Sequence, residues 1–581
     1  MMMDTWITDT PFSERFRYFT RANADEVGPE PFSPLGWTMA WEKGCMPGVA
    51  GGYVEFGAFE HHEFTLDPPE VFGNWGGYFY NVLSMTRIFG ARMPGASPEA
   101  IDKAYFGDHP GVPPYEEHPE DQNEEAEARV AETLGWVMST DGFPKMEEQS
   151  QRSRQALLDR PDHSRSTDEE LVAYARGMCQ LLYEIWVPYC VTALSCSIGP
   201  GAVQAACEGI GRPGDAVKLM AAIGNVESAN ASFSMWDLSR VVRDSEELGT
   251  TFDAGVAGLL DRLEASGSDE ARAFLEGWAE LIAKHGHRGP NEWDMRAHSW
   301  TTRPELALGM LERLRLQSDD RSPHDAAARA AGEREALTEE LLGIVEGDQE
   351  LHGTLSAGIK SASVFFSLRE MGKNACIRVI HEAKLAILEL GRRLVEARVI
   401  EDPQQVFMVT DAELNGFLDD PLDMRDTILQ RDEVFARLHE LEPPYIVDGE
   451  SGIPPISEWS RRGAAKAEVA SVGETLVGAP GAPGVATGTA RILLDPSDAS
   501  SLQPGDVMVA PTTDPSWTPL FMTASAVIVN VGAVASHAAI VSRELGIPCA
   551  VSVLNATDRV PEGATVTVDG STGTVIIDAP A

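Results

Sequence analysis

Basic residues are scarce in this sequence, which contains 46 Lys and Arg against 90 Asp and Glu among 581 residues, a formal net charge of −44. Such an acidic surface repels the phosphate backbone of nucleic acids and anionic lipids. We therefore expect neither nucleic acid nor a membrane as a partner. The acidic residues are spread along the chain, with a local cluster at 116–127. This distribution favours a role in solubility over a binding site.

Other features that the sequence lacks bear on where in the cell the protein is located. The seven cysteines form no C-x-x-C pair and no regular framework, which is typical of reduced thiols in a cytoplasmic protein. The first residues lack the basic segment and apolar core of a signal peptide. The longest weakly charged stretch, 181–207, is interrupted by Glu184, Pro188 and a Gly-Pro-Gly sequence. It predicts a buried helix or helix pair, because a membrane span requires about 20 mostly apolar residues. We expect a cytoplasmic protein.

The most informative stretch is GAVASHAAIVSRELGIP at residues 532–548. An apolar run at 524–531 ends at a glycine, and His537 follows where 538–545 begins to read as a helix. The unpaired N–H groups and positive end of such a helix favour a bound anion. An imidazole there is nucleophilic near neutral pH and can carry a phosphoryl group covalently. The alternative is that His537 only caps or packs against the helix.

This stretch closely resembles the phosphohistidine motif of the phosphoenolpyruvate-utilising enzymes, which include phosphoenolpyruvate synthase, pyruvate phosphate dikinase and rifampicin phosphotransferase. The resemblance continues in GVATG at 484–488, PGDV at 504–507, TDPSWTP at 513–519 and DGSTG at 569–573. It implies that His537 is the phosphorylated residue.

The same resemblance implies that Gly532, Ser536 and Arg543 belong to the phosphohistidine loop. Two neighbouring residues depart from the family pattern: Ala533 and Ser552 stand where many members have glycine. Both lie beside the motif, so we expect them to affect the shape of the loop more than its chemistry.

Residues 1–115 are rich in aromatic residues, Gly and Pro, for example in PLGWT at 34–38 and GGYFYN at 76–81. They form either an irregular packed domain or the wall of a pocket for an organic molecule. Both segments loosely resemble those that follow the nucleotide-binding domain in rifampicin phosphotransferase-like proteins.

Helical periodicity dominates residues 120–280 and 324–397. Between them, HGHRGPNEWD at 285–294 interrupts the pattern. Its two histidines lack the spacing of helical zinc motifs, so we predict no metal site. The segment resembles a signature in the acceptor-facing domain of the same phosphotransferases. The resemblance implies a substrate-binding role for its matching residues, whereas an ion pair of Arg288 with Glu292 or Asp294 that holds the loop is the structural alternative. The matching residues are His287, Arg288, Glu292 and Asp294.

The segment LREMGK at 368–373 places Arg369 and Lys373 on one helical face with Glu370 adjacent. A solvated ion-pair face explains this pattern without any function. The segment also matches the rifampicin phosphotransferase-like pattern, in which these positions lie at the transfer site. Phosphoryl transfer requires fixed cations around the equatorial oxygens, and we predict Arg369, Glu370 and Lys373 as catalytic.

We predict a multidomain α+β protein with a largely helical substrate-binding body and a C-terminal α/β swivelling domain that carries His537. The expected divisions are an aromatic N-terminal part of the acceptor region at 1–115, the helical body at 116–440, a linker at 441–479 and the swivelling domain at 480–581. Proline pairs and an alanine-rich stretch suggest the linker, which suits a mobile carrier.

The sequence contains no Walker-type loop, and nothing in it resembles an ATP-grasp domain or a pyruvate-binding barrel. Phenylphosphate synthase, a family member, divides its carrier and ATP-binding parts between subunits. We therefore expect a phosphotransferase component that takes a phosphoryl group from an ATP-grasp-type partner, with ATP and Mg²⁺ bound there, and passes it to a hydroxyl of a small organic acceptor. The alternatives are a phosphocarrier that exchanges phosphoryl groups with a protein, and an inactive relative that only binds.

Overall fold

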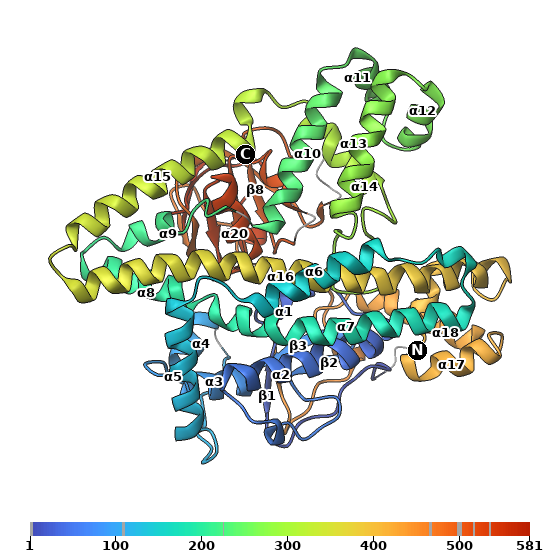
Figure 1. Ribbon diagram of the computed structural model, residues 1–581, viewed down its shortest axis with the longest axis horizontal. Helices are drawn as coiled ribbons and strands as arrows, with labels where there is room; N and C mark the ends of the chain where they lie inside the picture. Colours follow the sequence, from blue (N-terminus) through green and yellow to red (C-terminus); the bar gives the residue numbers. More distant parts are fainter. Residues whose placement is uncertain are drawn as a thin grey trace. The chain divides into compact units, whose positions relative to one another are not determined.

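The computed structural model describes residues 4–106, 111–224, 226–463, 467–496, 502–514, 517–533 and 536–580. Residues 1–3 of the N-terminus, 464–466 of the predicted linker and 515–516 of the TDPSWTP segment lie outside these ranges. The chain divides into two compact units (Figure 1). Unit 1 comprises Met1–Ser195, Trp293–Ala297 and Met371–Ala465, and unit 2 comprises Cys196–Glu292, His298–Glu370 and Lys466–Ala581.

Unit 1 combines a small antiparallel sheet with helices. The strand order is β2-β3-β1-β4, with β1 Tyr18–Thr20, β2 Phe72–Trp75, β3 Tyr78–Val82 and β4 Ile446–Asp448. Its helices are α1 Ala24–Val27, a π-helix Gly36–Cys45, α2 Met46–Phe56, α3 Leu83–Ala91, α4 Pro98–Phe106, α5 Glu124–Ser139, α6 Pro144–Leu158, α7 Asp168–Ser195, α17 Asp411–Asp419 and α18 Arg425–Leu438. Short 3₁₀ turns cover His61–Glu63, His163–Arg165, Pro403–Met408 and Ile456–Glu458.

The aromatic side chains of the N-terminal region form a packed core in unit 1. Trp37 and Trp41, on the π-helix, stack with ring centroids 5.4 Å apart and planes at 14°. Phe32 meets Trp41 edge-on at 4.8 Å. Six aromatic side chains of this region are each at most 2% exposed: Trp37, Trp41, Trp75, Tyr78, Phe79 and Tyr80. These side chains therefore favour the packed-domain alternative over a pocket wall.

The stretch at 181–207 forms the end of one helix and the start of the next, as predicted. Helix α7 ends at Ser195, and α8, Ile198–Gly209, follows after two residues. By length and composition, Asp168–Gly209 is apolar enough to cross a membrane, and 56% of its most apolar window is buried inside the structure. Buried core helices pass the same test, so this is weak evidence for a span.

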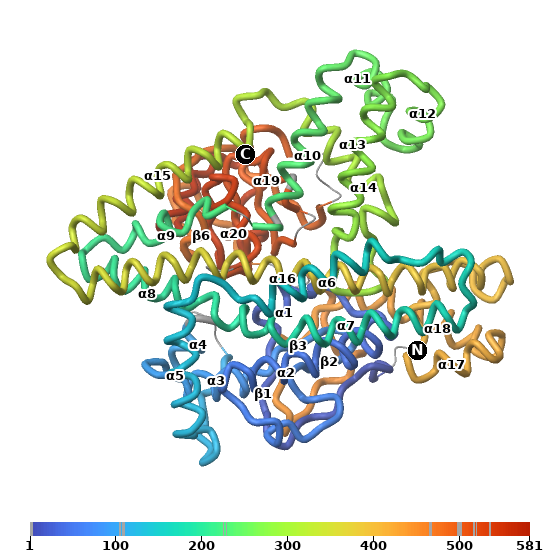
Figure 2. Tube along the Cα trace, viewed as in Figure 1, coloured from blue at the N-terminus to red at the C-terminus, as the bar shows by residue number. Residues whose placement is uncertain are grey.

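Unit 2 begins with helices. These are α8, α9 Ala216–Leu219, α10 Glu227–Arg243, α11 Glu246–Asp253, α12 Leu259–Ser266, α13 Asp269–His285, α14 Glu305–Leu314 and α15 Pro323–Ile344, with 3₁₀ turns at Pro213–Asp215 and Asp319–Arg321. After α15 the chain turns back into α16, Gln349–Glu396, a helix of 48 residues (Figure 2). Residues of α16 up to Glu370 belong to unit 2, and those from Met371 onward belong to unit 1.

The C-terminal part of unit 2 is an α/β fold around an eight-stranded sheet of order β5-β12-β11-β7-β8-β9-β10-β6. Strands β7 to β10 run parallel, and the outer pairs are antiparallel. The strands are β5 Thr475–Val477, β6 Ala479–Ala482, β7 Val485–Ile492, β8 Val507–Ala510, β9 Ala526–Val529, β10 Cys549–Val551, β11 Thr565–Asp569 and β12 Thr574–Ala579. The helices are α19 Thr518–Phe521, α20 His537–Leu545 and α21 Ala556–Arg559.

The α+β fold class is confirmed, and α20 starts at His537, where the sequence begins to read as a helix. Short apolar runs bounded by turns at 507–510 and 526–529 indicate strands, and they coincide with β8 and β9. The domain boundaries stay predictions. Within the predicted linker, 441–479, β4 pairs with β1 and β5 pairs with β12.

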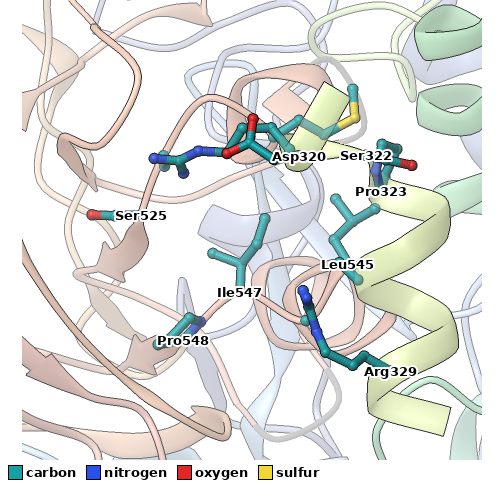
Figure 3. Close-up of a pocket in the computed structure, with 13 residues that line it drawn as sticks. Asp320, Ser322, Pro323, Arg329, Ser525, Leu545, Ile547 and Pro548 are labelled. Atoms are coloured by element: carbon teal, nitrogen blue, oxygen red, sulfur yellow. The ribbon is translucent and has the colours of Figure 1, made fainter. Parts of the chain in front are cut away.

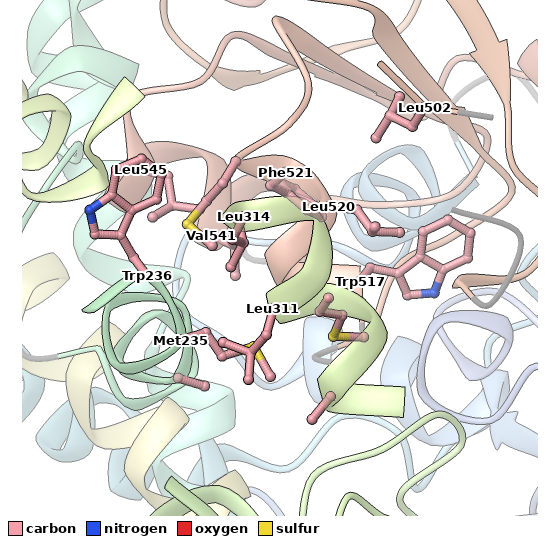
Figure 4. Close-up of a cluster of buried hydrophobic side chains, with 14 of the residues drawn as sticks. Met235, Trp236, Leu311, Leu314, Leu502, Trp517, Leu520, Phe521, Val541 and Leu545 are labelled. Carbon is pink, nitrogen blue, oxygen red and sulfur yellow. The ribbon is translucent and has the colours of Figure 1, made fainter. Parts of the chain in front are cut away.

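A shared hydrophobic cluster joins the helices of unit 2 to this sheet. Leu311 and Leu314 of α14 and Trp236 of α10 face Phe521 and Val541 from the C-terminal part (Figure 4). All five side chains are at most 4% exposed. Burial of this apolar surface stabilises the contact between the helices and the domain that carries His537.

Candidate functional site

His537 is the first residue of α20. Ser536 caps this helix, and its hydroxyl accepts a hydrogen bond from the Ala539 N–H at 3.3 Å. Gly532 leaves room for the cap, because a Cβ there would lie 3.0 Å from the Ser536 Oγ. The amides at the start of a helix have no carbonyl partner within it and favour a bound anion, and the imidazole of His537, which is 4% exposed, lies at this end of α20.

Two threonine hydroxyls hold the imidazole of His537. Thr513 Oγ1 lies 3.0 Å from Nδ1 and Thr518 Oγ1 lies 3.1 Å from Nε2. In a neutral imidazole one ring nitrogen donates a hydrogen bond and the other accepts one, so one threonine hydroxyl is the acceptor and the other is the donor. The edge of the Phe521 ring, at 6.0 Å and 87°, completes the contacts. The imidazole is therefore fixed in orientation.

The sequence did not single out Thr513 and Thr518. Both occur in the TDPSWTP segment, which contributes only to the family resemblance. The sequence signal that could have identified them is a pair of hydroxyl residues five positions apart, after the buried strand β8. Their convergence on His537 depends on the fold, because 19 or more residues separate them from it.

Replacing Thr518 by valine is expected to destabilise the C-terminal domain by about 1–3 kcal/mol, because the variant leaves a buried ring nitrogen without its partner. Urea unfolding followed by circular dichroism measures the change. Thr475→Val, on the exposed side of the edge strand β5, is the matched control and is expected to have little effect. Equal stability of the two variants would contradict the buried contact.

The departure at Ser552 has a structural explanation. Its backbone has φ of 54°, in the left-handed region that favours glycine, which accounts for the glycine common in the family. The Ser552 hydroxyl donates a hydrogen bond to the Gly532 carbonyl. In this chain the serine therefore ties down the loop that precedes His537.

Arg543 lies two helical turns from His537. It is 1% exposed, and its three guanidinium nitrogens have no hydrogen-bond partner among the described residues. Burial lowers its pKa to about 10. The guanidinium carbon lies 5.9 Å from the ring centroid of Phe366, on α16. Arg543 thus faces the helical part of unit 2.

The predicted substrate-binding loop follows α13. His287, Arg288 and Glu292 are each 2% exposed, and Arg288 Nη1 lies 3.6 Å from Glu292 Oε1. This ion pair matches the structural alternative for the loop. The Asn291 N–H donates to Asp514 Oδ2 at 3.3 Å, so the loop contacts the segment that holds Thr513 and, through it, the surroundings of His537.

Asp294, the fourth predicted residue of this loop, belongs to unit 1 and holds the start of the π-helix. Its Oδ1 accepts a hydrogen bond from the Ser33 hydroxyl at 2.6 Å, and its Oδ2 accepts one from the Ser33 N–H at 3.3 Å. Burial raises the pKa of this carboxyl, which is 2% exposed. A Cβ at Gly36 would lie only 2.1 Å from Oδ1.

Gly36→Ala is expected to lower stability by about 1–3 kcal/mol, because the added methyl group overpacks a site where Asp294 cannot move away from Ser33. Thermal unfolding checks the effect. Gly135→Ala is the matched control: it lies inside α5 with nothing within 4 Å of an added Cβ, and we expect it to stabilise that helix slightly. A neutral Gly36→Ala would refute the tight contact.

Arg369 and Glu370 form an ion pair on α16, with Arg369 Nη1 2.8 Å from Glu370 Oε1. Glu370 is 3% exposed and the Arg369 side chain 18%, so this is not the fully solvated pair of the functionless alternative. Lys373, one turn later on the same helix, belongs to unit 1. Among the predicted site residues, only Lys373 and Asp294 fall outside unit 2.

Among the described residues, no group of three or more His, Cys, Asp or Glu side chains could hold a metal ion.

Two segments of the chain match known domain families. Residues 189–370 match the rifampicin phosphotransferase fourth domain, and residues 502–573 match the mobile domain of PEP-utilising enzymes. The first segment contains the loop with Arg288 and Glu292 as well as Arg369 and Glu370. The second contains His537 and both threonines.

Individual relatives agree with these matches. The uncharacterized phosphotransferase YvkC of Bacillus subtilis is 29% identical over 363 residues, which cover 59% of this chain and 41% of the relative. The rifampicin phosphotransferase of Streptomyces sviceus is 28% identical over 372 residues, 62% of this chain and 40% of the relative. An uncharacterized protein of Mycobacterium bovis is 26% identical over 588 residues, 98% of this chain and 62% of the relative.

The chain thus spans less than two thirds of the length of each of these relatives. Its carrier segment and its helical segment nevertheless both match parts of one enzyme family, and the surroundings of His537 follow the motif of that family. Both segments are thus similar to parts of phosphotransferases among the PEP-utilising enzymes.

Proposed function

We propose that this chain is a phosphotransferase component that carries a phosphoryl group on His537 from an ATP-charged donor to a hydroxyl of a small organic acceptor. The observation that supports this most directly is the imidazole at the start of α20, held at both nitrogens by Thr513 and Thr518. A ring fixed in this way needs little reorganisation before it attacks phosphorus.

The proposed reaction has two displacements. In the first, a ring nitrogen of His537 attacks the phosphorus of the donor, the N–P bond forms, and the P–O bond to the leaving group breaks. The attacking nitrogen must first release its threonine. In the second, the acceptor oxygen attacks phosphorus, the P–N bond breaks, and the hydroxyl proton passes to a base.

We propose Arg369, Glu370 and Lys373 as the residues that assist the second displacement. Arg369 and Lys373 offer positive charge to the equatorial oxygens of the phosphoryl group. Glu370, held in place by Arg369 at 2.8 Å, is our candidate for the base. His287, Arg288 and Glu292 remain proposed substrate-side residues, and the contact between Asn291 and Asp514 supports their proximity to the carrier segment.

The donor is proposed to be an ATP-grasp-type domain on a partner protein or elsewhere in a longer polypeptide. Bound there, ATP with Mg²⁺ would supply the phosphoryl group. The residues described in this chain are assigned no nucleotide contact in this proposal.

The test is to incubate the purified chain with ATP labelled at both the β- and γ-phosphates, alone and with lysate of its source. Acid-labile, base-stable label that requires the lysate would support charging by a separate donor. Label that is lost when a protein-free extract of metabolites is added would support a small acceptor. Label that moves only to another protein would favour the phosphocarrier alternative, and no label under any condition would favour an inactive relative.

A further inference from the structure

One face of α20 carries His537, Ile540 and Glu544, because residues at three- and four-residue spacing lie above one another on a helix. Val541 and Leu545, which adjoin this face, belong to the large hydrophobic cluster that includes Trp236 and Leu311 of the helices as well as Val527 and Val551 of the sheet. His537 contacts residues of its own domain, whereas Ile540 and Glu544 have neighbours from another part of unit 2.

Those neighbours are residues 222–224 and 226–229, which we call the docking segment. Glu544, 5% exposed, accepts hydrogen bonds from two of its backbone amides: the Ile223 N–H donates to Oε1 at 2.9 Å and the Gly224 N–H to Oε2 at 3.1 Å. The Ala222 N–H donates to the Arg543 carbonyl at 3.2 Å. Three consecutive N–H groups thus bind the C-terminal end of α20.

The backbone of the docking segment is shaped for this contact. Ala222 and Gly224 have φ of 44° and 76°, in the left-handed region, which turns successive N–H groups toward one anion in the manner of a backbone nest. Arg334 of α15 donates to the Ala221 carbonyl at 3.1 Å and also to that of Ala222, so α15 holds the segment in place.

Apolar contacts continue toward His537. Ile540, midway along the face, is 3% exposed and packs in a small cluster of its own with Val226 and Ala229. Farther along the same surface, Gln317 Nε2 donates to Thr523 Oγ1 at 2.8 Å. The docking segment therefore contacts the helix of His537 at its middle and its end.

A pocket of about 200 Å³ opens between the start of α15, near Pro323 and Arg329, and the mobile-domain residues Leu545, Ile547 and Pro548 (Figure 3). Arg543 is buried nearby in α20 without a hydrogen-bond partner among the described residues, a state that solvation would relieve.

We propose that residues 222–224 and 226–229 form the docking surface on which the carrier domain rests when it faces the acceptor, and that Glu544 is the positioning residue that fixes the direction of His537 there. This inference rests on the proposed function. Because Glu544 and His537 share one short helix, an anchor at the C-terminal end sets the orientation of the N-terminal end.

Hydrogen–deuterium exchange on the full chain tests the docking without any phosphoryl chemistry. Glu544→Gln keeps the size of the side chain, but its NH₂ group then faces one of the two backbone N–H donors. One of the two hydrogen bonds is therefore lost. We expect exchange at residues 222–224 to become about tenfold faster or more, with β7 to β10 unchanged. The matched control is Glu562→Gln, since Glu562 accepts a backbone N–H on the exposed side of the same domain. Wild-type exchange at 222–224 in Glu544→Gln would overturn the proposal.

A second variant tests whether the effect of Glu544→Gln comes from destabilisation of the whole domain. Val226→Asp places a charge against Ile540 from the opposite side of the contact, outside the carrier domain. We expect it to accelerate exchange in α20 while β7 to β10 stay protected. If Glu544→Gln loosened the sheet and Val226→Asp left α20 fully protected, the docking surface would be refuted.

A functional readout separates positioning from stability. With donor and acceptor present, Glu544→Gln is expected to leave labelling of His537 unchanged and to slow transfer to the acceptor about tenfold or more, with partial rescue by Glu544→Asp. Equal transfer by wild type and Glu544→Gln would overturn the positioning role. A chain that is never labelled at His537 but shows the exchange effect would refute the proposed function and leave the docking surface standing.

Discussion

Replacing His537 by alanine is expected to abolish covalent labelling by the donor, because no other group takes the place of the imidazole at the start of α20. The variant also leaves the buried hydroxyls of Thr513 and Thr518 without the imidazole, so we expect a loss of stability of about 1–3 kcal/mol, whereas the cap at Ser536 and the apolar residues of α20 remain. The measurement is acid-labile, base-stable label on wild type and variant under identical charging conditions, with the phosphorylated peptide located by mass spectrometry under neutral conditions.

The matched control for this experiment is His439→Ala. His439 is a partly buried histidine at the end of α18 whose Nδ1 lies 2.8 Å from the Phe435 carbonyl, and it has no proposed part in the chemistry. It should be labelled like wild type. Label that persists in His537→Ala would mean that another residue carries the phosphoryl group, and the role proposed for the threonines would fail with it.

Replacing Arg369 by methionine is expected to slow transfer to the acceptor about 10²- to 10³-fold, the effect typical of removing one fixed donor from a developing charge. Charging of His537 should proceed normally, because Arg369 is assigned only to the second displacement. The rate at which label leaves the phosphorylated chain after addition of the metabolite extract measures the effect.

Arg392→Met controls for loss of a charge on the same helix, since Arg392 pairs with Glu389 on an exposed face. Its transfer rate should equal that of wild type. If Arg369→Met transferred as fast as Arg392→Met, the ion pair of Arg369 with Glu370 would be structural, as the spacing alone allows. Slower charging together with slower transfer would show that Arg369 does not act at the second step only.

Elements set by local pattern were predictable from the sequence. The strands at 507–510 and 526–529 are short apolar runs bounded by turns, and α20 begins where the residues at 538–545 begin to read as a helix. The helix pair around 195–198 follows from the interruption of an apolar stretch. In each case the signal lies within a few residues of the feature.

Contacts between distant residues were not predictable in this way. Thr513 and Thr518 reach His537 only because β8, β9 and α20 are neighbours in the fold, and their spacing alone does not indicate which residue they bind. Asp294 matched a substrate-binding signature, yet its carboxyl holds Ser33, 261 residues away in the chain. The aromatic residues of the N-terminal region were compatible with a core or a pocket, because composition alone does not determine exposure.

The pair of threonines around His537 has a consequence for the protons of the imidazole. A hydroxyl changes from donor to acceptor by rotating about its C–O bond, so Thr513 and Thr518 can exchange roles without exchanging protons with water. Whichever nitrogen carries phosphorus, the N–H on the opposite nitrogen finds an oxygen that accepts it. If His537 carries the phosphoryl group as proposed, the ring nitrogen opposite to phosphorus therefore keeps a hydrogen-bond partner in both the charged and the uncharged state.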